Sequence, residues 1–304
     1  MKYCIIANPT AGKGHAALLI PQFTSYLHSK NLDFEVVQTE HPGHAYDLAL
    51  QAVRDGAEVV VGAGGDGTMN EVLNGLVAAR ETGLPEVMMG VLPIGRGNDF
   101  SFGMGVPQDL TAACDALVTA RQRRIDLGRI TGGLYPAGKI FGNGVGIGFD
   151  TKVGFEANKM NHLRGFLPYL LGALKTLFAY GTAPQLRIEL DNETITLPAL
   201  MVSIMNGRRM GGAFMMAPQS KSDDGVFTLC IANLVSRPAI LLLIGRFIKG
   251  TQESHPAIRF RNSKKITVTA LDGSMACHAD GETICTEGTQ LTIELIPAFL
   301  PLIY

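Results

Sequence analysis

The sequence predicts an α/β protein whose N-terminal domain is built on a parallel sheet and whose C-terminal domain is β-rich and sandwich-like. Two observations lead to this fold class. Short β-branched runs alternate with helical patterns over the first third of the chain, whereas strand-like runs joined by turns predominate from about Arg124 onward. Strands that alternate with helices are typical of a parallel sheet, because each parallel connection needs a crossover.

The first third of the chain contains four runs that predict strands and two clear helical patterns. The predicted strands are Tyr3–Ala7, Phe34–Gln38, Glu58–Val61 and Val87–Leu92. Between them, Leu19, Phe23 and Leu27 recur four residues apart, and an alanine-rich apolar stripe runs from Ala45 to Val53. Such stripes favour amphipathic helices that pack on a sheet.

The rest of the chain contains mostly strand-like runs. These are Arg124–Ile130, Gly138–Gly142, Gln185–Leu190, Thr194–Leu197, Ala199–Met205, Val226–Ala232, Lys265–Thr269 and Leu291–Leu295. Two apolar helical patterns interrupt them, at Leu163–Ala179 and Arg237–Lys249. We therefore expect a first domain over residues 1–125 and a second over residues 126–290, with a tail of residues 291–304 that returns to the first.

The composition excludes several classes of protein. A formal net charge of −1 provides no bulk attraction for the polyanionic backbone of nucleic acids, so we expect no nucleic-acid partner. The five cysteines are dispersed and form no C-x-x-C pair, which indicates reduced, buried thiols. The most hydrophobic stretches are far shorter than the ~20 apolar residues of a spanning helix. We expect a cytoplasmic chain.

A glycine-rich loop is the strongest chemical signal in the sequence. Gly64–Thr68 follows the predicted strand that ends at Val61 and precedes a helical pattern that begins at Met69. Glycines let backbone N–H groups approach an anion, and a helix N-terminus adds donors and a positive dipole end. The carboxylate of Asp66 would repel a phosphate unless Mg²⁺ lay between them, so the loop predicts a metal-nucleotide site.

Structural roles for the same residues are the competing interpretation. Asp66 could form an Asx turn, and Thr68 with Glu71 matches a capping box at a helix start. A literal G-x-G-x-x-G match begins at Gly62, but a dinucleotide site would need an acidic residue at the end of the next strand. Glu86 opens that strand instead.

Seven segments in this order resemble the bacterial diacylglycerol-kinase-like lipid kinases, whose catalytic domain is shared by sphingosine and ceramide kinases. They are Asn8–Gly14, Gly64–Glu71, Pro93–Phe100, Phe141–Asp150, Asn206-Gly207 with Gly211-Gly212, Asp223–Gly225 and Asp280–Glu282, and Thr39 adds a single matching position. The resemblance runs nearly from end to end. It implies an ATP-dependent kinase that transfers the γ-phosphate to the hydroxyl of a diacylglycerol-like lipid.

The resemblance also assigns nucleotide contacts. These would be Asn8, Thr39, Gly64, Gly65, Asp66, Gly67, Thr68, Asn70, Glu71, Gly95 and Arg96. Arg96 departs from the family, which usually has Thr or Ser there. A guanidinium at a phosphate turn could make bidentate contacts to ATP, or it could crowd the site.

The resemblance places the catalytic base and a second Mg²⁺ site in the β-rich domain. Asp280 would accept the proton of the lipid hydroxyl, although Asp280-Gly281 is also a common hairpin turn. Asp224 would bind a structural Mg²⁺ through its carboxylate, together with the backbone carbonyls of Lys221 and Val226. A metal-free Asp-Gly turn is the alternative for this segment.

The lipid substrate would be reached from the protein surface, by peripheral contact with a membrane. The two apolar helical patterns could line an acyl groove, although such stripes also suit a core. Basic residues that could face anionic head groups are Arg246, Lys249, Arg259, Arg261, Lys264 and Lys265. The chain could also form a homodimer. Rival functions are an NAD kinase-like enzyme and a non-catalytic lipid- or nucleotide-binding protein.

Overall fold

The computed structural model describes residues 1–160, 167–179 and 183–304. These form two compact units, one of Met1–Asp126 with Ala298–Tyr304 and the other of Leu127–Pro297. The returning tail therefore starts later than the expected residue 291. The reason is that strand β15 (Gln290–Ile303) still pairs with the second unit as far as Glu294.

The first unit is built on a parallel sheet. β1 (Tyr3–Ala7) pairs on one side with β2 (Phe34–Gln38) and on the other with β3 (Val59–Gly64). β4 (Met88–Pro93) lies beyond β3, and the end of β15 pairs in parallel with β4. The predicted N-terminal parallel sheet is therefore confirmed.

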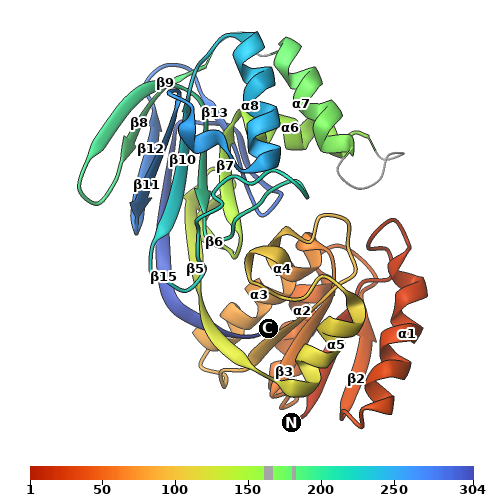
Figure 1. Cartoon of the computed structure of the whole chain (residues 1–304). Helices are drawn as coiled ribbons and strands as arrows, with labels where there is room; N and C mark the ends of the chain where they lie inside the picture. Colours follow the sequence, from red (N-terminus) through yellow and green to blue (C-terminus); the bar gives the residue numbers. More distant parts are fainter. Residues whose placement is uncertain (161–166, 180–182) are drawn as a thin grey trace. The chain divides into compact units, whose positions relative to one another are not determined.

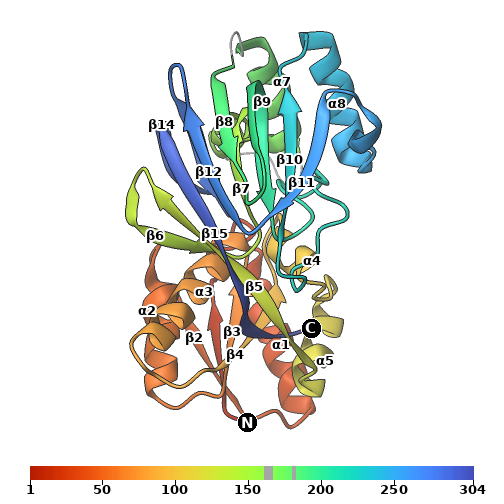
Figure 2. The same cartoon turned by 90° about the vertical axis from the view of Figure 1, so that its left-hand side faces the viewer.

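Helices cover both faces of this sheet (Figures 1 and 2). α1 (Ala16–Ser29) packs with α5 (Leu110–Thr119) over one face, and α2 (His44–Arg54) packs with α3 (Asp66–Glu81) over the other. Right-handed crossovers explain this division. The chain moves outward from β1 to β2 through α1, and it returns across β1 to β3 and β4 through α2 and α3.

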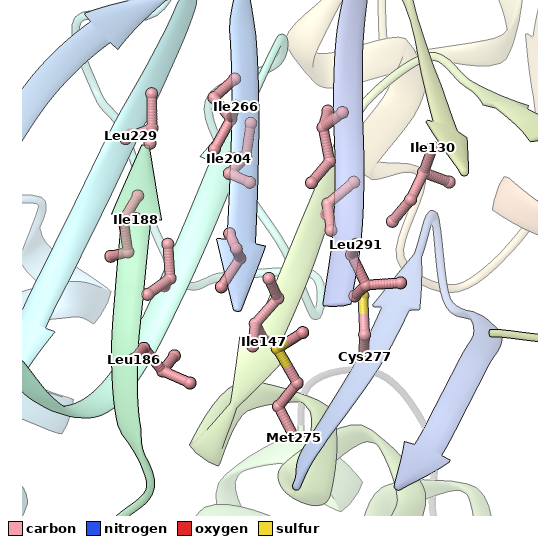
Figure 3. Close-up of a cluster of buried hydrophobic side chains, with 14 of the residues drawn as sticks. Ile130, Ile147, Leu186, Ile188, Ile204, Leu229, Ile266, Met275, Cys277 and Leu291 are labelled. Carbon is pink, nitrogen blue, oxygen red and sulfur yellow. The ribbon is translucent and has the colours of Figure 1, made fainter. Parts of the chain in front are cut away.

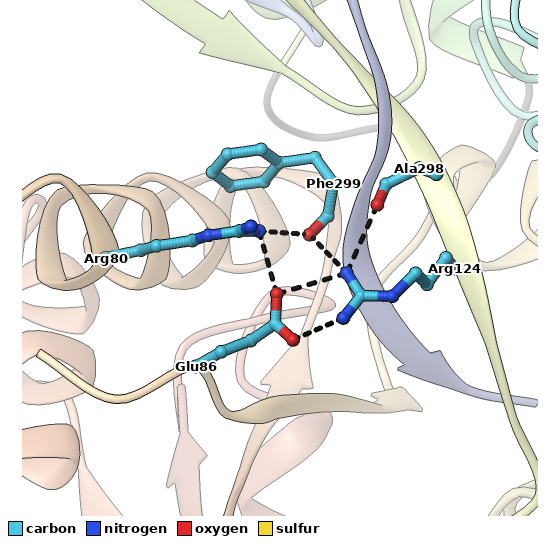
Figure 4. Close-up of polar contacts among 5 residues, drawn as sticks. All are labelled: Arg80, Glu86, Arg124, Ala298 and Phe299. Atoms are coloured by element: carbon cyan, nitrogen blue, oxygen red, sulfur yellow. Dashed lines mark hydrogen bonds and ion pairs between the residues drawn. The ribbon is translucent and has the colours of Figure 1, made fainter.

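A charged cluster attaches the returning tail to the first unit (Figure 4). Arg80 of α3 forms an ion pair with Glu86 (Nη1–Oε1, 2.8 Å) and donates to the Phe299 carbonyl (2.6 Å). Arg124 also pairs with Glu86 and donates to the carbonyl oxygens of Ala298 (3.2 Å) and Phe299 (3.3 Å). Hydrogen bonding from Arg124, aided by the charges of both arginines, lowers the pKa of Glu86.

The second unit is β-rich, as predicted. Its strands, besides β15, are β5 (Gln122–Gly132), β6 (Tyr135–Phe141), β7 (Gly144–Gly148), β8 (Gln185–Glu189), β9 (Thr194–Met205), β10 (Phe227–Asn233), β11 (Ile258–Ser263), β12 (Lys265–Ala270), β13 (Met275–Ala279) and β14 (Glu282–Gly288). They pair in the order β14-β13-β7-β9-β8-β12-β15, while β10 pairs with β9 and β11, and β5 pairs with β6.

Two expected strands, Thr194–Leu197 and Ala199–Met205, form the single strand β9. Its first half pairs with β8 and its second half pairs with β7 and β10. Pro198 lies where the partners change, and its carbonyl accepts the N–H of Leu234 (2.9 Å). Proline favours a strand end or an irregular position. Here it marks a change of pairing within a continuous strand.

Apolar side chains form two layers in the second unit. One cluster lies between strands and includes the fully buried Ile147, Ile204 and Ile266 (Figure 3). The other lies under three helices, α6 (Phe149–Asn158), α7 (Leu167–Ala179) and α8 (Arg237–Lys249). Among the helices in the described part of the chain, none is both long and apolar enough to span a bilayer.

Several elements were not predicted from the sequence. They include β7, β11, α5, α6 and the short helix α4 (Asp99–Gly103), and the bounds of β13 and β14, of which only the turn between them was predicted. β7 has the sequence Gly-Val-Gly-Ile-Gly, whose glycines are typical of a loop, although all five residues are buried in the strand. The expected helix at Leu163–Ala179 corresponds to α7 from Leu167 onward, and residues 163–166 lie outside the described part.

Glu86→Gln tests the charged cluster. Loss of the charge that joins both arginines should lower the free energy of unfolding by about 1 kcal/mol, as for an exposed ionic network. The folded-state pKa lies below the unfolded value of 4.5, so the stabilisation is complete above that pH and is lost as the pH falls through the folded-state pKa. Thermal unfolding at neutral and acidic pH measures this. If the difference in stability between Glu86→Gln and the unaltered protein is as large at acidic as at neutral pH, the electrostatic explanation is wrong.

Candidate functional site

Four neighbouring strands of the first unit end at the same edge of the parallel sheet. Asn8 follows β1, Thr39 follows β2, Gly64 ends β3 and Gly95 lies just after β4. The N–H of Thr39 donates to the carbonyl of Ala7, at the end of β1 (2.9 Å). Ligands of open α/β sheets bind outside the carboxyl ends of the strands, where helix N-termini also point. The fold therefore brings these sequence-predicted residues to one edge.

Asn8 joins the segment after β1 to the glycine loop. Its N–H donates to the carbonyl of Ala63 (2.9 Å), and its Nδ2 donates to Thr68 Oγ1 (3.0 Å). Its Oδ1 accepts both the N–H (3.0 Å) and the hydroxyl (2.8 Å) of Thr10. Asn8 therefore holds two loops together through protein contacts at both ends of its amide.

The loops that follow β3 and β4 touch through their backbones. A Cβ on Gly95 would stand 2.2 Å from the Cα of Gly65. Asn98 closes the second loop in a left-handed conformation (φ 53°), with Oδ1 accepting the N–H of Gly95 (3.1 Å) and Nδ2 donating to the Pro93 carbonyl (3.1 Å). Arg96 is exposed on this loop. Asn98 was part of a recognised motif, but its role in closing the loop was not predicted.

Two carboxylates meet beside the glycine loop. Asp66 Oδ1 accepts the N–H of Phe100 (2.9 Å). A Cβ on Gly97 would stand 2.8 Å from Asp66 Oδ2 and 3.6 Å from Asp99 Oδ2, so both carboxylates lie around the space that this glycine leaves open. Oxygen-only ligands of this kind suit Mg²⁺. Asp99 is buried and was not among the predicted site residues.

Helix α3 begins at Asp66, and its cap residue, Gly65, has no side chain to cover the first N–H groups. The sequence had allowed a capping box between Thr68 and Glu71. Glu71 instead accepts the N–H groups of Gly43 (2.9 Å) and Ala45 (3.1 Å), at the start of α2. The start of α3 therefore has no side-chain cap, and a helix start of this kind suits an anion.

The remaining predicted residues of this helix have different surroundings. Asn70 is buried, and its Oδ1 accepts from Nδ2 of Asn74 one turn later (3.2 Å). Gly67 is exposed, and a Cβ there would meet nothing within 4 Å. Gly64 has no such room, because a Cβ would stand 2.4 Å from Thr68 Oγ1. A ligand could therefore approach the backbone of Gly67, whereas the side chain of Thr68 covers Gly64.

Asp280 lies in the second unit, in the turn between β13 and β14. Its Oδ2 accepts the N–H of Gly142 (2.7 Å), and its Oδ1 accepts the N–H groups of Asn143 (3.0 Å) and Gly144 (2.9 Å). Its own N–H donates to the Gly144 carbonyl (2.9 Å). The carboxylate therefore fixes the turn between β6 and β7, whatever chemistry it also performs.

The segment Lys221–Val226 forms a turn that precedes β10, with Ser222 buried. Gly225 has a left-handed conformation (φ 74°), and Asp224 Oδ1 accepts the N–H of Val226 (3.3 Å). The side chains of Lys221 and Asp224 are exposed. One carboxylate and nearby carbonyls fit a weakly held hard cation, and the same contacts also form an Asx turn. Within the described residues, no cluster of three or more His, Cys, Asp or Glu side chains could hold a metal ion.

Comparison with known families covers almost all of the chain. Residues 2–130 match the model of the diacylglycerol kinase catalytic domain, and residues 143–304 match that of the YegS C-terminal NAD kinase beta sandwich-like domain. The chain belongs to the diacylglycerol kinase catalytic domain family. It is a diacylglycerol kinase homologue and hence a lipid kinase, and membership of a kinase family implies ATP.

Curated relatives and solved structures agree with this family. The chain is 30% identical to the diacylglycerol kinase of Staphylococcus saprophyticus over 282 residues, which cover 91% of this chain and 88% of that one. A diacylglycerol kinase of Staphylococcus aureus is also 30% identical, with 91% and 85% covered. A crystal structure of a Bacillus anthracis diacylglycerol kinase has a TM-score of 0.74 at 23% identity, with 100% and 96% covered.

A more distant likeness concerns the fold alone. Yeast NADH kinase, solved in complex with NADH, has a TM-score of 0.53 at 11% identity, with 99% of this chain and 82% of that chain covered. The family model for residues 143–304, which describes an NAD kinase beta sandwich-like domain, covers most of the second unit. The predicted sandwich-like fold is therefore confirmed.

A surface cavity of about 690 Å³ lies at the opposite edge of the sheet in the first unit. It is lined by residues near the amino ends of β3 and β4, among them Glu58, Glu86, Met88 and Arg124. None of the residues that the family resemblance assigns to nucleotide binding lines this cavity. Backbone N–H groups and a helix start mark the candidate kinase site at the carboxyl edge.

Gly95→Ala tests the contact between the two loops. The new Cβ would overlap Gly65, so the change should lower the free energy of unfolding by about 1–3 kcal/mol, the usual cost of overpacking, and weaken binding of an ATP analogue. Gly67→Ala is the matched control for stability alone, because a Cβ there meets no protein atom. Thermal unfolding and calorimetric titration measure the two effects. Equal stability of both variants would mean that the loops can separate without cost.

Proposed function

We propose that this kinase binds ATP at the carboxyl edge of the first unit's sheet and transfers its γ-phosphate to the hydroxyl of a diacylglycerol-like lipid. The observation that carries this proposal is the convergence of the end of β3 at Gly64, the glycine-rich start of α3 (Asp66–Thr68) and the loop after β4. Glycine backbones and a helix N-terminus suit a chain of phosphates. The curated relatives named diacylglycerol kinase support the choice of lipid.

Asp66 and Asp99 are proposed to hold Mg²⁺ beside these phosphates. When bound, the ion would offset the negative charge on the phosphates during transfer. Asp66 also orients the loop after β4 through the N–H of Phe100, so one carboxylate links metal binding to loop position. Asn8 and Asn98 hold the two loops that the phosphates would contact.

Arg96 is proposed to contact the phosphates of ATP. Its side chain is exposed on the loop after β4, where a guanidinium could form two hydrogen bonds to phosphate oxygens. Arg96→Ala should therefore weaken binding of an ATP analogue more than Arg96→Thr does, because threonine keeps one hydrogen-bonding group. Calorimetric titration of both variants measures this. Tighter binding by Arg96→Ala would mean that the side chain obstructs the site.

The reaction is tested by incubating the protein with γ-labelled ATP, Mg²⁺ and a total lipid extract. We expect label in a phosphorylated lipid, and no label when Mg²⁺ is omitted or when Asp66→Ala is used, because both changes remove the proposed metal site. Circular dichroism of Asp66→Ala checks that it folds. Label transferred to added NAD⁺ would favour an NAD kinase-like activity, and lipid binding without any transfer would favour a non-catalytic protein.

Asp280 is proposed as the acceptor of the proton from the lipid hydroxyl. Phosphoryl transfer needs such a group besides positioned phosphates and a neutralising metal. Because Asp280 also accepts three backbone N–H groups, its replacement would disturb the neighbouring turn. In Asp280→Asn, the side-chain NH₂ group would face at least one of these N–H groups and could not accept its hydrogen bond. Glu282, two residues later and exposed, is the comparison carboxylate.

Asp280→Asn should lower kcat by about 10²- to 10⁴-fold, the usual contribution of a positioned base, with little change in ATP affinity. Steady-state kinetics, calorimetry and thermal unfolding should be measured together with those of Glu282→Gln. If Glu282→Gln loses the same activity at unchanged stability, and Asp280→Asn loses mainly stability, then the proton acceptor is Glu282 and Asp280 only holds the turn.

Membrane contact is proposed for the outer faces of α7 and α8, which pack together in the second unit (Figure 1). Their exposed apolar side chains are Leu167, Leu171 and Phe178 on α7 and Leu241, Leu242 and Ile248 on α8. Exposed Arg237 and Lys249 lie at the two ends of α8. Apolar stripes flanked by basic residues suit an anionic bilayer surface. In contrast, Arg261 and Lys265 form ion pairs with glutamates.

Vesicle binding tests this surface. Phe178→Asp and Leu242→Asp place charge on side chains that are 74% and 69% exposed, so they should weaken co-sedimentation with vesicles of phosphatidylcholine and phosphatidylglycerol without lowering stability. Leu134→Asp, in the turn between β5 and β6, is the matched control because Leu134 is 68% exposed. If all three variants bind vesicles as the unaltered protein does, these helices are not the membrane contact.

Two further proposals concern Asp224 and assembly. Asp224 and the carbonyls of Lys221 and Val226 would hold a structural Mg²⁺, and a rise in unfolding temperature with Mg²⁺ that Asp224→Asn abolishes would support it. The homodimer stays a prediction. Sedimentation velocity over a range of protein concentrations tests it.

A further inference from the structure

Three residues lie side by side on adjacent strands of the second unit. His278 of β13 is paired with Gly146 of β7, which is paired in turn with Ser203 of β9. Directly paired residues of antiparallel strands point to the same face. The central glycine leaves that face open, and a Cβ on it would stand 2.4 Å from His278 Nε2 and 2.5 Å from Asp150 Oδ2. The imidazole and the carboxyl group therefore meet above Gly146.

Asp150 is held in this position by its neighbours. Its Oδ2 accepts the hydroxyl of Ser203 (2.9 Å), and its Oδ1 accepts the N–H of Thr151 (2.8 Å). Protein atoms crowd both polar groups, although part of each residue reaches the surface. This burial raises the pKa of Asp150 to about 7 and lowers the pKa of His278 to about 4. The imidazole is therefore neutral around physiological pH, with one N–H and one acceptor nitrogen.

The acceptor nitrogen of His278 contacts the turn that carries Asp280. Its Nδ1 accepts the N–H of Gly281 (3.3 Å), which indicates that the ring proton lies on Nε2. Asp280 and Gly281 both have positive φ values, 48° and 85°, as in a two-residue type I′ hairpin turn. The Asp280 carboxylate holds one side of this turn, and His278 holds the next residue.

We propose that His278 is a positioning residue for the Asp280–Glu282 turn, which it holds through the hydrogen bond from the N–H of Gly281 to its Nδ1. The proposal rests on the proposed function, in which this turn carries the proton acceptor. The acceptor must stand within hydrogen-bond reach of the lipid hydroxyl, so a small displacement of the turn would slow the transfer step while leaving the ATP loops of the first unit unchanged.

Two substitutions of His278 test whether Nδ1, and not the rest of the ring, holds the turn. Asn places Oδ1 close to the position of Nδ1, so His278→Asn should keep the contact with Gly281 and most of kcat. Gln extends its amide towards the position of Nε2, so His278→Gln should lower kcat by about 10-fold or more, because misplaced groups lose catalytic efficiency steeply, while the KM for ATP stays unchanged. Ser203→Ala removes the hydrogen bond to Asp150 but no contact with the turn. It should therefore lower stability more than kcat.

Hydrogen exchange provides a readout that does not need activity. The amides of Gly281 and Glu282 should exchange faster in His278→Gln than in His278→Asn or the unaltered protein, because the turn opens more often. Equal losses of kcat in both His278 variants, or unchanged exchange in His278→Gln, would overturn the proposal. If the unaltered protein phosphorylates no lipid, the proposed function fails, while the exchange comparison still decides what His278 does to the turn.

Discussion

The backbone of Gly95 lies against that of Gly65, and the arrangement of the candidate ATP site depends on this contact. Gly95 cannot carry a side chain, because its Cβ would stand 2.2 Å from the Cα of Gly65. The close approach brings the loop after β4 beside the start of α3, where Asp66 accepts the N–H of Phe100 and shares the space over Gly97 with Asp99. The backbone proposed to bind phosphates and the carboxylates proposed to hold Mg²⁺ are thus adjacent, because the segments just after two strands meet at glycines.

The first unit could be predicted largely from local patterns. The residues of β1, β2 and the start of α3 follow apolar periods and a rare glycine string, which depend only on near neighbours in sequence. The meeting of Asp66 with Asp99 could not be predicted in this way, since it requires that β4 lie beside β3 and that the two loops touch. Glu71 shows the same limit: its spacing from Thr68 matched a capping box, but its carboxylate caps a different helix.

The second unit was harder to predict where glycine replaced apolar side chains. β7 is a buried strand that looks like a loop because its alternate positions are Gly144, Gly146 and Gly148. Glycine at position 146 is needed because two polar side chains occupy the space above it. The turn at Asp280 was predicted from its Asp-Gly pair. Its attachment to residues 142–144 was not, because three hydrogen bonds join segments almost 140 residues apart.

The course of the chain through the first unit has a consequence for its synthesis. Ala298–Tyr304 belong to that unit, yet they are made only after all of Leu127–Pro297. Until then the edge of β4 lacks its parallel partner, and Arg80 and Arg124 lack the carbonyl groups of the tail. Domains commonly fold as they leave the ribosome. Here the second unit can complete its fold first, and the domain that begins the chain is the last to be finished.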